Sequence, residues 1–168
     1  AVFVVDNTNR TEARYCIDDF LRVRQRQDNY HNTHNTLAMC KKYVTKHLSK
    51  EFEVSKADQA ELLNETMKYF QEQESFSMDD FSEKVIRQPE VVESFTRFRQ
   101  EYEQDRDIRI EDEFGISDSA VKKQARSYKS VIKLDRNFHI YVHGNRNLLE
   151  QGEDEKGKFY KVYYEEEE

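Results

Sequence analysis

Histidines, cysteines and paired carboxylates are the residues with which this chain could bind a metal or catalyse a reaction, and their spacing disfavours both. His139 and His143 lie four residues apart in a strand-like segment, so their α-carbons would be roughly 13 Å apart and could not share one metal. His31 and His34 fall within NYHNTHNT, where we expect a turn and a helix cap and find no carboxylate at a diagnostic spacing. A metal at that pair is the less favoured interpretation.

The cysteines and acidic pairs are equally unsuited to catalysis. Cys16 and Cys40 stand in apolar, helical contexts without CxxC spacing, which favours buried, reduced thiols. Asp18 and Asp19, like the pair at 79–80, are adjacent, so on a helix they diverge by about 100° and suit a helix N-terminus better than acid–base chemistry. We therefore expect no catalytic site, metal, cofactor or enzyme activity.

Basic residues offer a different chemistry, which is contact with phosphate. The net charge of −7 opposes nucleic-acid binding by the chain as a whole. Residues 117–136, however, carry six basic side chains against two acids, a local charge of +4. Residues 150–168 carry eight acids against three lysines, a local charge of −5. The chain is electrically polarised, and only its basic segment suits a phosphate backbone.

The candidate nucleic-acid-binding residues form two groups. The first lies on a predicted helix face and its continuation into a hairpin, and comprises Lys122, Lys123, Arg126, Lys129 and Lys133. The second lies beside Tyr30 and comprises Arg22, Arg24 and Arg26. The competing interpretation is that both groups are solvated charges on an acidic protein, which is the usual meaning of a charge cluster.

Two sharper interpretations concern the same region. In one, GISDSAVKKQARSY is the recognition helix of a helix-turn-helix, with Lys122, Gln124 and Arg126 facing a groove. We prefer a helix packed on a sheet through Ile116, Val121 and Ala125, because the preceding DRDIRIEDEF lacks a helical stripe. In the other, exposed tyrosines stack on single-stranded bases, although such residues more often pack across strands. These tyrosines are Tyr141, Tyr160, Tyr163 and Tyr164.

The elements that would position these residues are helices in the middle of the chain and strands at its ends. Phe138, Ile140 and Val142 alternate with His139 and Tyr141, the period expected of a half-buried strand. With the preceding turn at 135–137, this segment predicts a β-hairpin. Strands are expected near 2–5, 130–134, 137–143 and 158–164, and the last three are expected to form an antiparallel meander.

Helices are predicted from apolar spacings of three and four and from capping residues. Ser55 with Asp58 marks a capping box at the start of a helix that ends near residue 73. Ser77 with Asp80 repeats the pattern, and Pro89 suits the first turn of the next helix. Further helices are expected around 17–24, 37–48 and 117–126, and an exposed connector or edge segment at 104–113.

Composition and these elements predict the class. At 168 residues, 12% of them aromatic, the chain suits one domain that buries about two-thirds of its unfolded surface. With four glycines and one proline it has no flexible linker, so we expect a single α+β domain with several packed helices and a small C-terminal antiparallel meander. No apolar run approaches the ~20 residues of a membrane span, and no secretory signal is visible, so we expect a cytoplasmic protein without membrane contact.

Several segments, in their order and spacing, resemble the bacterial nucleoid-associated protein family, the NdpA-like proteins. They are RYCIDDFLRVRQRQDNYHNT, FSMDDFSEKVIRQPEVVESFTRF, and GISDSAVKKQARSY followed by the hairpin and GKFYKVYYEEE. The resemblance implies a location at the bacterial nucleoid and DNA as the partner, with RNA as an alternative. Because the chain opens at Ala1 in a strand-like run, we expect it to be the C-terminal domain of a longer protein.

Two functional hypotheses follow. In the first, the chain binds DNA mainly through phosphate contacts at 122–133, with little sequence specificity. In the second, it is a protein-interaction or dimerisation module whose exposed sheet and acidic tail contact nucleoid proteins or a second copy, while a missing N-terminal part binds DNA. They differ in whether the basic side chains form one open surface or are neutralised by Glu111, Asp112 and the tail.

Overall fold

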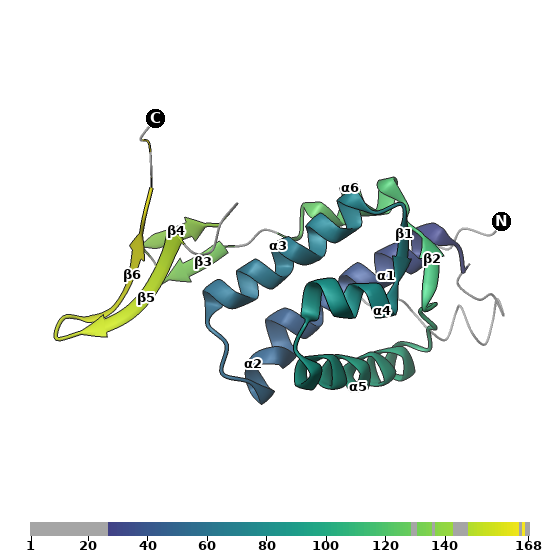
Figure 1. Ribbon diagram of the computed structural model, residues 1–168, viewed down its shortest axis with the longest axis horizontal. Helices are drawn as coiled ribbons and strands as arrows, with labels where there is room; N and C mark the ends of the chain where they lie inside the picture. The colour runs from purple at the N-terminus through teal and green to yellow at the C-terminus, as the bar shows by residue number, and fades with distance from the viewer. Residues whose placement is uncertain (1–26, 129–130, 136, 143–147, 165, 167–168) are drawn as a thin grey trace, which may run out of the picture.

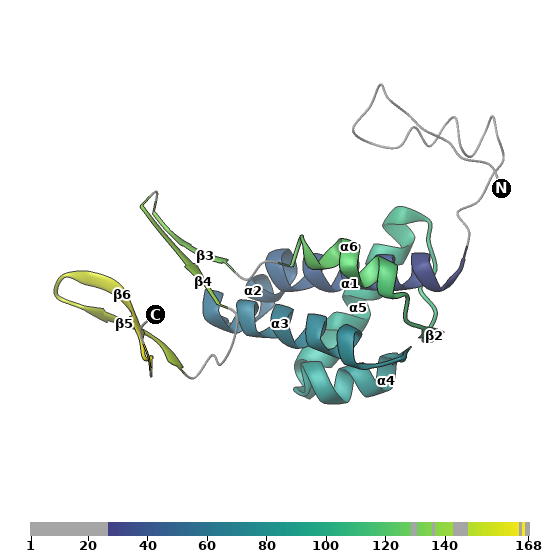
Figure 2. The ribbon, with the colours of Figure 1, turned by 90° about the horizontal axis from the view of Figure 1, so that it is seen from above.

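The computed structural model describes residues 27–128, 131–135, 137–142, 148–164 and 166. Within them, a body of packed helices precedes two β-hairpins (Figure 1). Viewed from above, the hairpins extend from one end of the helical body (Figure 2). This arrangement confirms the predicted α+β class. The strand expected at 2–5 and the helix expected at 17–24 lie outside the described residues.

The elements follow one another along the chain with short connections. The helical segments are α1 (Asn29–Lys42), η2 (Tyr43–His47), α2 (Leu48–Glu51), α3 (Lys56–Glu72), α4 (Met78–Phe81), η3 (Ser82–Ile86), α5 (Pro89–Arg106) and α6 (Asp118–Ala125), of which η2 and η3 are π-helical. The strands are β1 (Ser75–Ser77), β2 (Glu113–Gly115), β3 (Val131–Leu134), β4 (Phe138–Tyr141), β5 (Leu149–Asp154) and β6 (Gly157–Val162).

Local capping explains where two of the predicted helices begin. The Ser55 hydroxyl accepts from the Asp58 N–H at 3.1 Å, and the Asp58 carboxylate accepts from the Ser55 N–H at 2.9 Å, which confirms the capping box. Pro89 stands in the first turn of α5, also as predicted. Ser77 occupies the N-cap position of α4, but its side chain makes no capping hydrogen bond there.

The α1 helix covers a segment in which we expected a turn. Asp28 caps it by accepting from the His31 N–H at 3.0 Å. His31 and His34 therefore lie in the first two helical turns, and the turn prediction was wrong. Threonine is accommodated in this helix because the Thr33 and Thr36 hydroxyls donate to carbonyls four residues back.

Aromatic side chains fill the core of the helical body. Phe76 stacks on Phe70 and Phe114, with ring centroids 5.3 and 4.8 Å away. Two of these rings belong to a small sheet that the sequence did not predict, because β1 pairs antiparallel with β2 and places Phe76 opposite Phe114. Phe81 and Phe95 complete this cluster at 1% and 2% exposure. Large, fully buried aromatic side chains of this kind dominate the stability of a small core.

The segment at 104–113 is exposed at eight of its ten residues and its last residue begins β2, as expected of a connector or edge segment, but it is held in place at one buried residue. It begins as the last turn of α5, which ends where Asp107 adopts a left-handed conformation with φ of 51°. Ile110 is then fully buried, and Arg99 on α5 holds the returning chain by donating to the Ile110 carbonyl and pairing with Asp112, each at 2.6 Å. The chain is thus fixed against α5 before it enters β2.

The C-terminal strands form two separate hairpins, not the continuous meander that we expected. β3 pairs antiparallel with β4, from Val131 opposite Tyr141 to Leu134 opposite Phe138. β5, which the sequence did not predict, pairs with β6, from Leu149 opposite Val162 to Asp154 opposite Gly157. Within the described residues no ladder joins β4 to β5, so each hairpin is a two-stranded sheet.

A small second apolar cluster holds the hairpins to the start of α3. It consists of buried Ala57, Ile132 and Leu149, with partly buried side chains of both hairpins against it. All seven large exposed hydrophobic residues of the described chain lie in or beside these hairpins. They are Phe138, Tyr141, Leu148, Phe159, Val162, Tyr163 and Tyr164.

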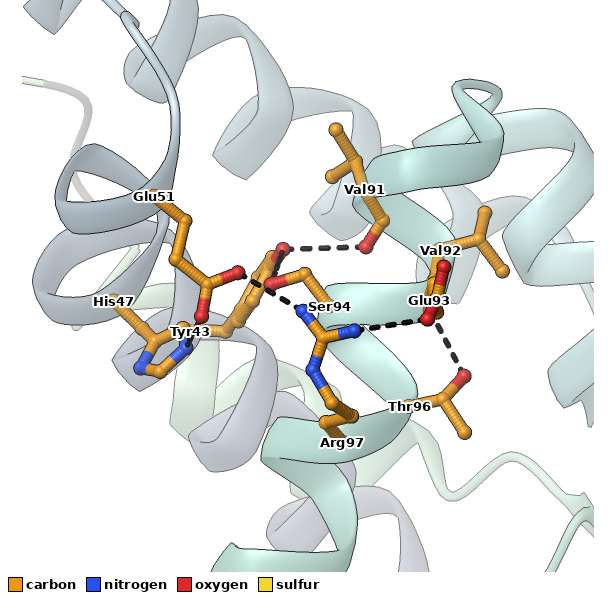
Figure 3. A network of polar contacts seen from close by, with 9 residues as sticks. All are labelled: Tyr43, His47, Glu51, Val91, Val92, Glu93, Ser94, Thr96 and Arg97. Atoms are coloured by element: carbon orange, nitrogen blue, oxygen red, sulfur yellow. Dashed lines mark hydrogen bonds and ion pairs between the residues drawn. The ribbon is translucent and has the colours of Figure 1, made fainter.

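A polar network ties the end of α2 to α5 (Figure 3). Glu51 lies 2.9 Å from the His47 ring and 3.3 Å from the Arg97 guanidinium. Nearby, the Tyr43 hydroxyl donates to the Ser94 hydroxyl at 3.0 Å. Hydrogen bonding from Ser94, followed by bonding and charge from His47 and Arg97, lowers the pKa of Glu51. The network therefore holds this carboxylate ionised beside α5.

Two further features concern the helices. Cys40 on α1 is 2% exposed, and burial raises the pKa of its thiol far above the ordinary range. None of the helices within the described ranges is long and apolar enough to cross a membrane.

Candidate nucleic-acid interface

The α6 helix carries the strongest candidate residues and packs on the N-terminal half of α1 (Figure 2). Its apolar face buries Ala120 and Val121 at 0% and 5% exposure. The predicted packing face is correct at Val121, but Ala125 is only half-buried and α6 packs on helices α1 and α3, not on the sheet that we expected. Lys122, Lys123 and Arg126 are all exposed, as the 3.6-residue period requires of positions next to a buried pair.

Three hydrogen bonds fix α6 and the chain after it to successive positions of α1. At its start, the Ser117 N–H donates to the buried Thr33 hydroxyl at 3.0 Å. In its last turn, the Gln124 side-chain amide lies 2.9 Å from Nδ1 of His34. Beyond it, the buried Tyr128 hydroxyl donates to the Leu37 carbonyl. The basic side chains therefore project from a rigidly placed helix.

The neighbouring surface of α1 adds an aromatic and a titratable group. Tyr30 and His34 stack with ring centroids 6.3 Å apart, and the Lys123 ammonium lies 6.0 Å from the centre of the Tyr30 ring. Burial, followed by the positive charges of Lys123, His31 and Arg106, lowers the pKa of His34. Arg106, at the end of α5, thus adds to a positive potential around His34. We call Tyr30, His34, Lys122, Lys123 and Arg126 the α1/α6 surface.

The structure brings together only part of the predicted set. Lys122 and Lys123 lie on α6 and Arg126 is its C-cap residue, whereas Lys133 is exposed on β3 of a separate hairpin. Lys129 and the second group, Arg22, Arg24 and Arg26, lie outside the described residues. Within the described chain none of the four placed residues forms an ion pair with an acid, and Asp112 pairs with Arg99 instead.

The sharper interpretations fare differently. The element before α6 is the strand β2, so no helix-turn-helix is present in this part of the chain. Among the tyrosines, Tyr141, Tyr163 and Tyr164 are exposed, but Tyr163 donates to Glu150 at 2.8 Å within an acidic hairpin. Tyr160 packs against the second apolar cluster. In the described residues, no three His, Cys, Asp or Glu side chains are grouped to hold a metal ion.

Sequence reasoning missed His34 as a member of the site and the contribution of Arg106 to its potential, and it expected Gln124 to face a nucleic-acid groove rather than His34. Tyr30 and His34 are four residues apart, so a helix prediction across NYHNTHNT would have placed them on one face. No local signal links them to Gln124, which is 90 residues away from His34. That proximity is a product of the tertiary fold.

The comparison with protein families decides the chain's relationships. The family model described as nucleoid-associated protein YejK matches residues 1–167. The chain belongs to this family. The match confirms the resemblance inferred from the sequence and establishes the chain as a nucleoid-associated protein by family. No curated protein and no solved structure matches it.

Proposed function

We propose that this nucleoid-associated protein binds DNA through the α1/α6 surface, mainly by contacts to phosphates. The observation that carries the proposal is the exposure of Lys122 and Lys123 on one short helix and of Arg126 at its C-cap, with no acidic partner among the described residues. Basic side chains without intramolecular partners can neutralise phosphates and release the counterions condensed on DNA. Family membership supports the nucleoid as the setting for this contact.

The hydrogen bonding of α6 argues against extensive base recognition. Gln124 is the α6 side chain best suited to bidentate recognition of adenine. It instead faces α1 and bonds to His34. Lys122, Lys123 and Arg126 remain for the nucleic acid, and such residues mostly position a protein on the backbone. We therefore expect little dependence of affinity on DNA sequence.

The acidic part of the chain explains how a protein of net charge −7 would orient on DNA. Acids concentrate in β5, in the turn that follows it and at the C-terminal end, whereas α6 presents three cations within five residues. Repulsion of the acidic hairpin from the duplex would direct the opposite, basic part of the molecule toward it. Affinity is then set by few contacts and falls with salt concentration, with a slope proportional to the number of phosphates contacted.

The test is fluorescence anisotropy with labelled double-stranded DNA, single-stranded DNA and RNA across a salt series. We expect binding to double-stranded DNA that weakens linearly with log salt concentration. A variant with Lys122, Lys123 and Arg126 all changed to Glu should lose it. The matched control changes Lys46, Lys50 and Lys68 to Glu, which are exposed lysines outside the α1/α6 surface. The control and test variants have the same formal net charge, because each replaces three basic residues by three glutamates.

Loss of binding in the α6 variant together with retention in the control supports the proposal. Equal loss in both variants would mean that net charge alone decides binding. Absence of binding to any probe at low salt would reject DNA contact by this chain. Stronger binding to single-stranded DNA or RNA than to duplex would replace the proposed ligand.

A second candidate function is a protein-interaction module formed by the hairpins. The observation that favours it is that all seven large exposed hydrophobic residues in the described chain lie between residues 138 and 164. Exposed apolar groups gathered in one region mark interaction sites more often than isolated ones do. A nucleoid protein with a basic surface would also be attracted by the neighbouring acidic tail.

A further inference from the structure

Two cations without an acidic partner in the described chain converge on one aromatic ring, where the last turns of α5 lie against the end of α1. The Lys42 ammonium lies 5.3 Å from the centre of the Tyr102 ring, and the Arg106 guanidinium carbon lies 4.7 Å from it. Both cationic side chains are exposed. The ring attracts each cation, but the two like charges repel each other, so an anion that contacts both would be stabilised.

The Tyr102 hydroxyl is a third donor at this position, and no group in the described chain accepts its hydrogen bond. Tyr102 is 2% exposed, and a buried tyrosine hydroxyl usually has a partner. No fully buried side-chain polar atom of the described residues lacks a partner, so this hydroxyl reaches the surface. Burial, which outweighs the opposing charge of Arg106, raises the pKa of Tyr102, so the hydroxyl stays protonated and can donate.

We propose that Lys42, Tyr102 and Arg106 hold a phosphate group of the DNA backbone. A phosphate has acceptor oxygens for all three side chains. The Arg106 guanidinium can bond two of these oxygens, the Lys42 ammonium supplies a compact charge, and the Tyr102 hydroxyl donates one hydrogen bond. The inference rests on the proposed function and adds a second contact outside the α1/α6 surface.

Arg106 connects this phosphate site to the α1/α6 surface. Burial and then neighbouring positive charges, that of Arg106 among them, lower the pKa of His34 in that surface. Along α1, Lys42 lies about 12 Å of helical rise beyond His34. Successive phosphates of one DNA strand advance by about 3.4 Å along the duplex axis, so Lys42 would reach a different phosphate from the one at Lys123. One duplex can therefore occupy both places.

The competing explanation is that the two cations only complement helix ends. Lys42 is the last residue of α1 and Arg106 is the last residue of α5, where positive charge offsets the partial negative charge of a helix C-terminus. That role requires neither the hydroxyl nor a ligand. Tyr102→Phe separates the two explanations, because it removes one oxygen atom and leaves the ring and both cations in place.

The first test is fluorescence anisotropy with labelled duplex DNA across a salt series. We expect Tyr102→Phe to weaken binding about tenfold, as expected for the loss of a hydrogen bond to a charged group, and to leave the salt slope unchanged. The double variant Lys42→Gln with Arg106→Gln should weaken binding and reduce the salt slope by about one, because one phosphate contact is lost.

Two control variants match these changes. Tyr43→Phe is the hydroxyl control, since the Tyr43 hydroxyl already donates to Ser94, and it should leave the DNA affinity unchanged. Lys50→Gln with Lys68→Gln is the charge control, since both lysines are exposed outside the phosphate site and the change in net charge is the same. It should leave the salt slope unchanged. The thermal unfolding of Tyr102→Phe should match that of the unmodified chain, because its hydroxyl has no partner in the described residues.

The second test identifies the source of the phosphate group. In an NMR titration, the Arg106 Nε–H signal should shift when a short duplex is added, and inorganic phosphate at the same concentration should not shift it. Tyr102→Phe should reduce the response to the duplex, and Tyr43→Phe should not. Saturation of the signal by micromolar inorganic phosphate would assign the site to free phosphate and overturn DNA as its source.

The outcomes distinguish a failure of this inference from a failure of the proposed function. Unchanged affinity and slope in the Tyr102 and Lys42/Arg106 variants, with loss of binding in the α6 variant, would overturn this inference alone. Loss of binding in the Tyr102 and Lys42/Arg106 variants, with full binding by the α6 variant, would overturn the α1/α6 surface and support this phosphate site. An equal reduction of slope in the charge control would overturn the assigned contact. Absence of duplex binding at low salt would overturn both proposals.

Discussion

Lys123 on α6 lies over the ring of Tyr30 on α1, with its ammonium 6.0 Å from the ring centre. An exposed cation at this distance gains about 0.5–1 kcal/mol from the aromatic face. The contact therefore positions the lysine and leaves its charge available. A carboxylate in the same place would neutralise that charge. It also joins the two helices whose relative position determines the geometry of the α1/α6 surface.

Replacing Thr33 by Val should weaken the attachment of α6. The change keeps the shape of a fully buried side chain but removes the acceptor for the Ser117 N–H. We expect a loss of about 1–2 kcal/mol in the free energy of unfolding, measured by urea denaturation. Thr36→Val is the control, since the Thr36 hydroxyl only donates to a carbonyl of its own helix. Equal effects of the two substitutions would contradict a special role for the Thr33 contact.

DNA bound at the α1/α6 surface should raise the pKa of His34. In the free protein, burial and then the charges of Lys123, His31 and Arg106 lower it. A phosphate near these cations would offset their charge and favour the protonated ring. An NMR titration of the imidazole Cε1 proton, with and without a short duplex, measures the shift. The signal of His139, on β4 of a separate hairpin, serves as the internal reference.

His34 should also make stability depend on pH in the weakly acidic range. Because its folded pKa lies below the unfolded value of about 6.5, the unfolded chain binds the proton more readily. Stability is therefore greatest above the unfolded pKa and decreases as the pH falls toward the folded pKa. Urea midpoints between neutral and mildly acidic pH should show this decrease, and His34→Gln should reduce it. An unchanged profile in that variant would assign the dependence to other groups.

The capping box at the start of α3 offers a test of local stability. Ser55→Ala removes the acceptor for the Asp58 N–H, and we expect it to lower the free energy of unfolding by about 1 kcal/mol. Ser49→Ala, at an exposed position in α2, should change it by less than about 0.5 kcal/mol. Thermal unfolding followed by circular dichroism distinguishes these values.

The sequence predicted those parts of the fold that depend on neighbouring residues. The α3 helix was correct at both ends because Ser55 and Asp58 interact within one turn. The β1–β2 sheet was missed because its strands, Ser75–Ser77 and Glu113–Gly115, are three residues long and their central residues are 38 residues apart in the sequence. A strand this short shows no periodic alternation of apolar and polar residues. β5 was missed for a related reason, since its sequence LEQGED is poor in β-branched and aromatic residues.

In the candidate site, too, the contacts between residues near in sequence were predictable and those between distant residues were not. The grouping of Lys122, Lys123 and Arg126 follows from their spacing on one helix. Their relation to Tyr30 and His34 required α6 to pack on α1, with Gln124 and His34 as the long-range contact. Lys133 was grouped with the helix because it is near in sequence, but β3 carries it on a different element.

The burial of Cys40 in α1 makes the reactivity of its thiol a measure of how often this helix opens. Thiol reagents react with the thiolate, and this thiol is both inaccessible and held protonated in the closed structure. In a Cys16→Ser background, the rate at which Cys40 is modified would equal the fraction of molecules in which α1 has opened, multiplied by the rate for a free thiol. The free energy of that opening can thus be measured under native conditions, at one residue that the chain already carries and without introducing a cysteine.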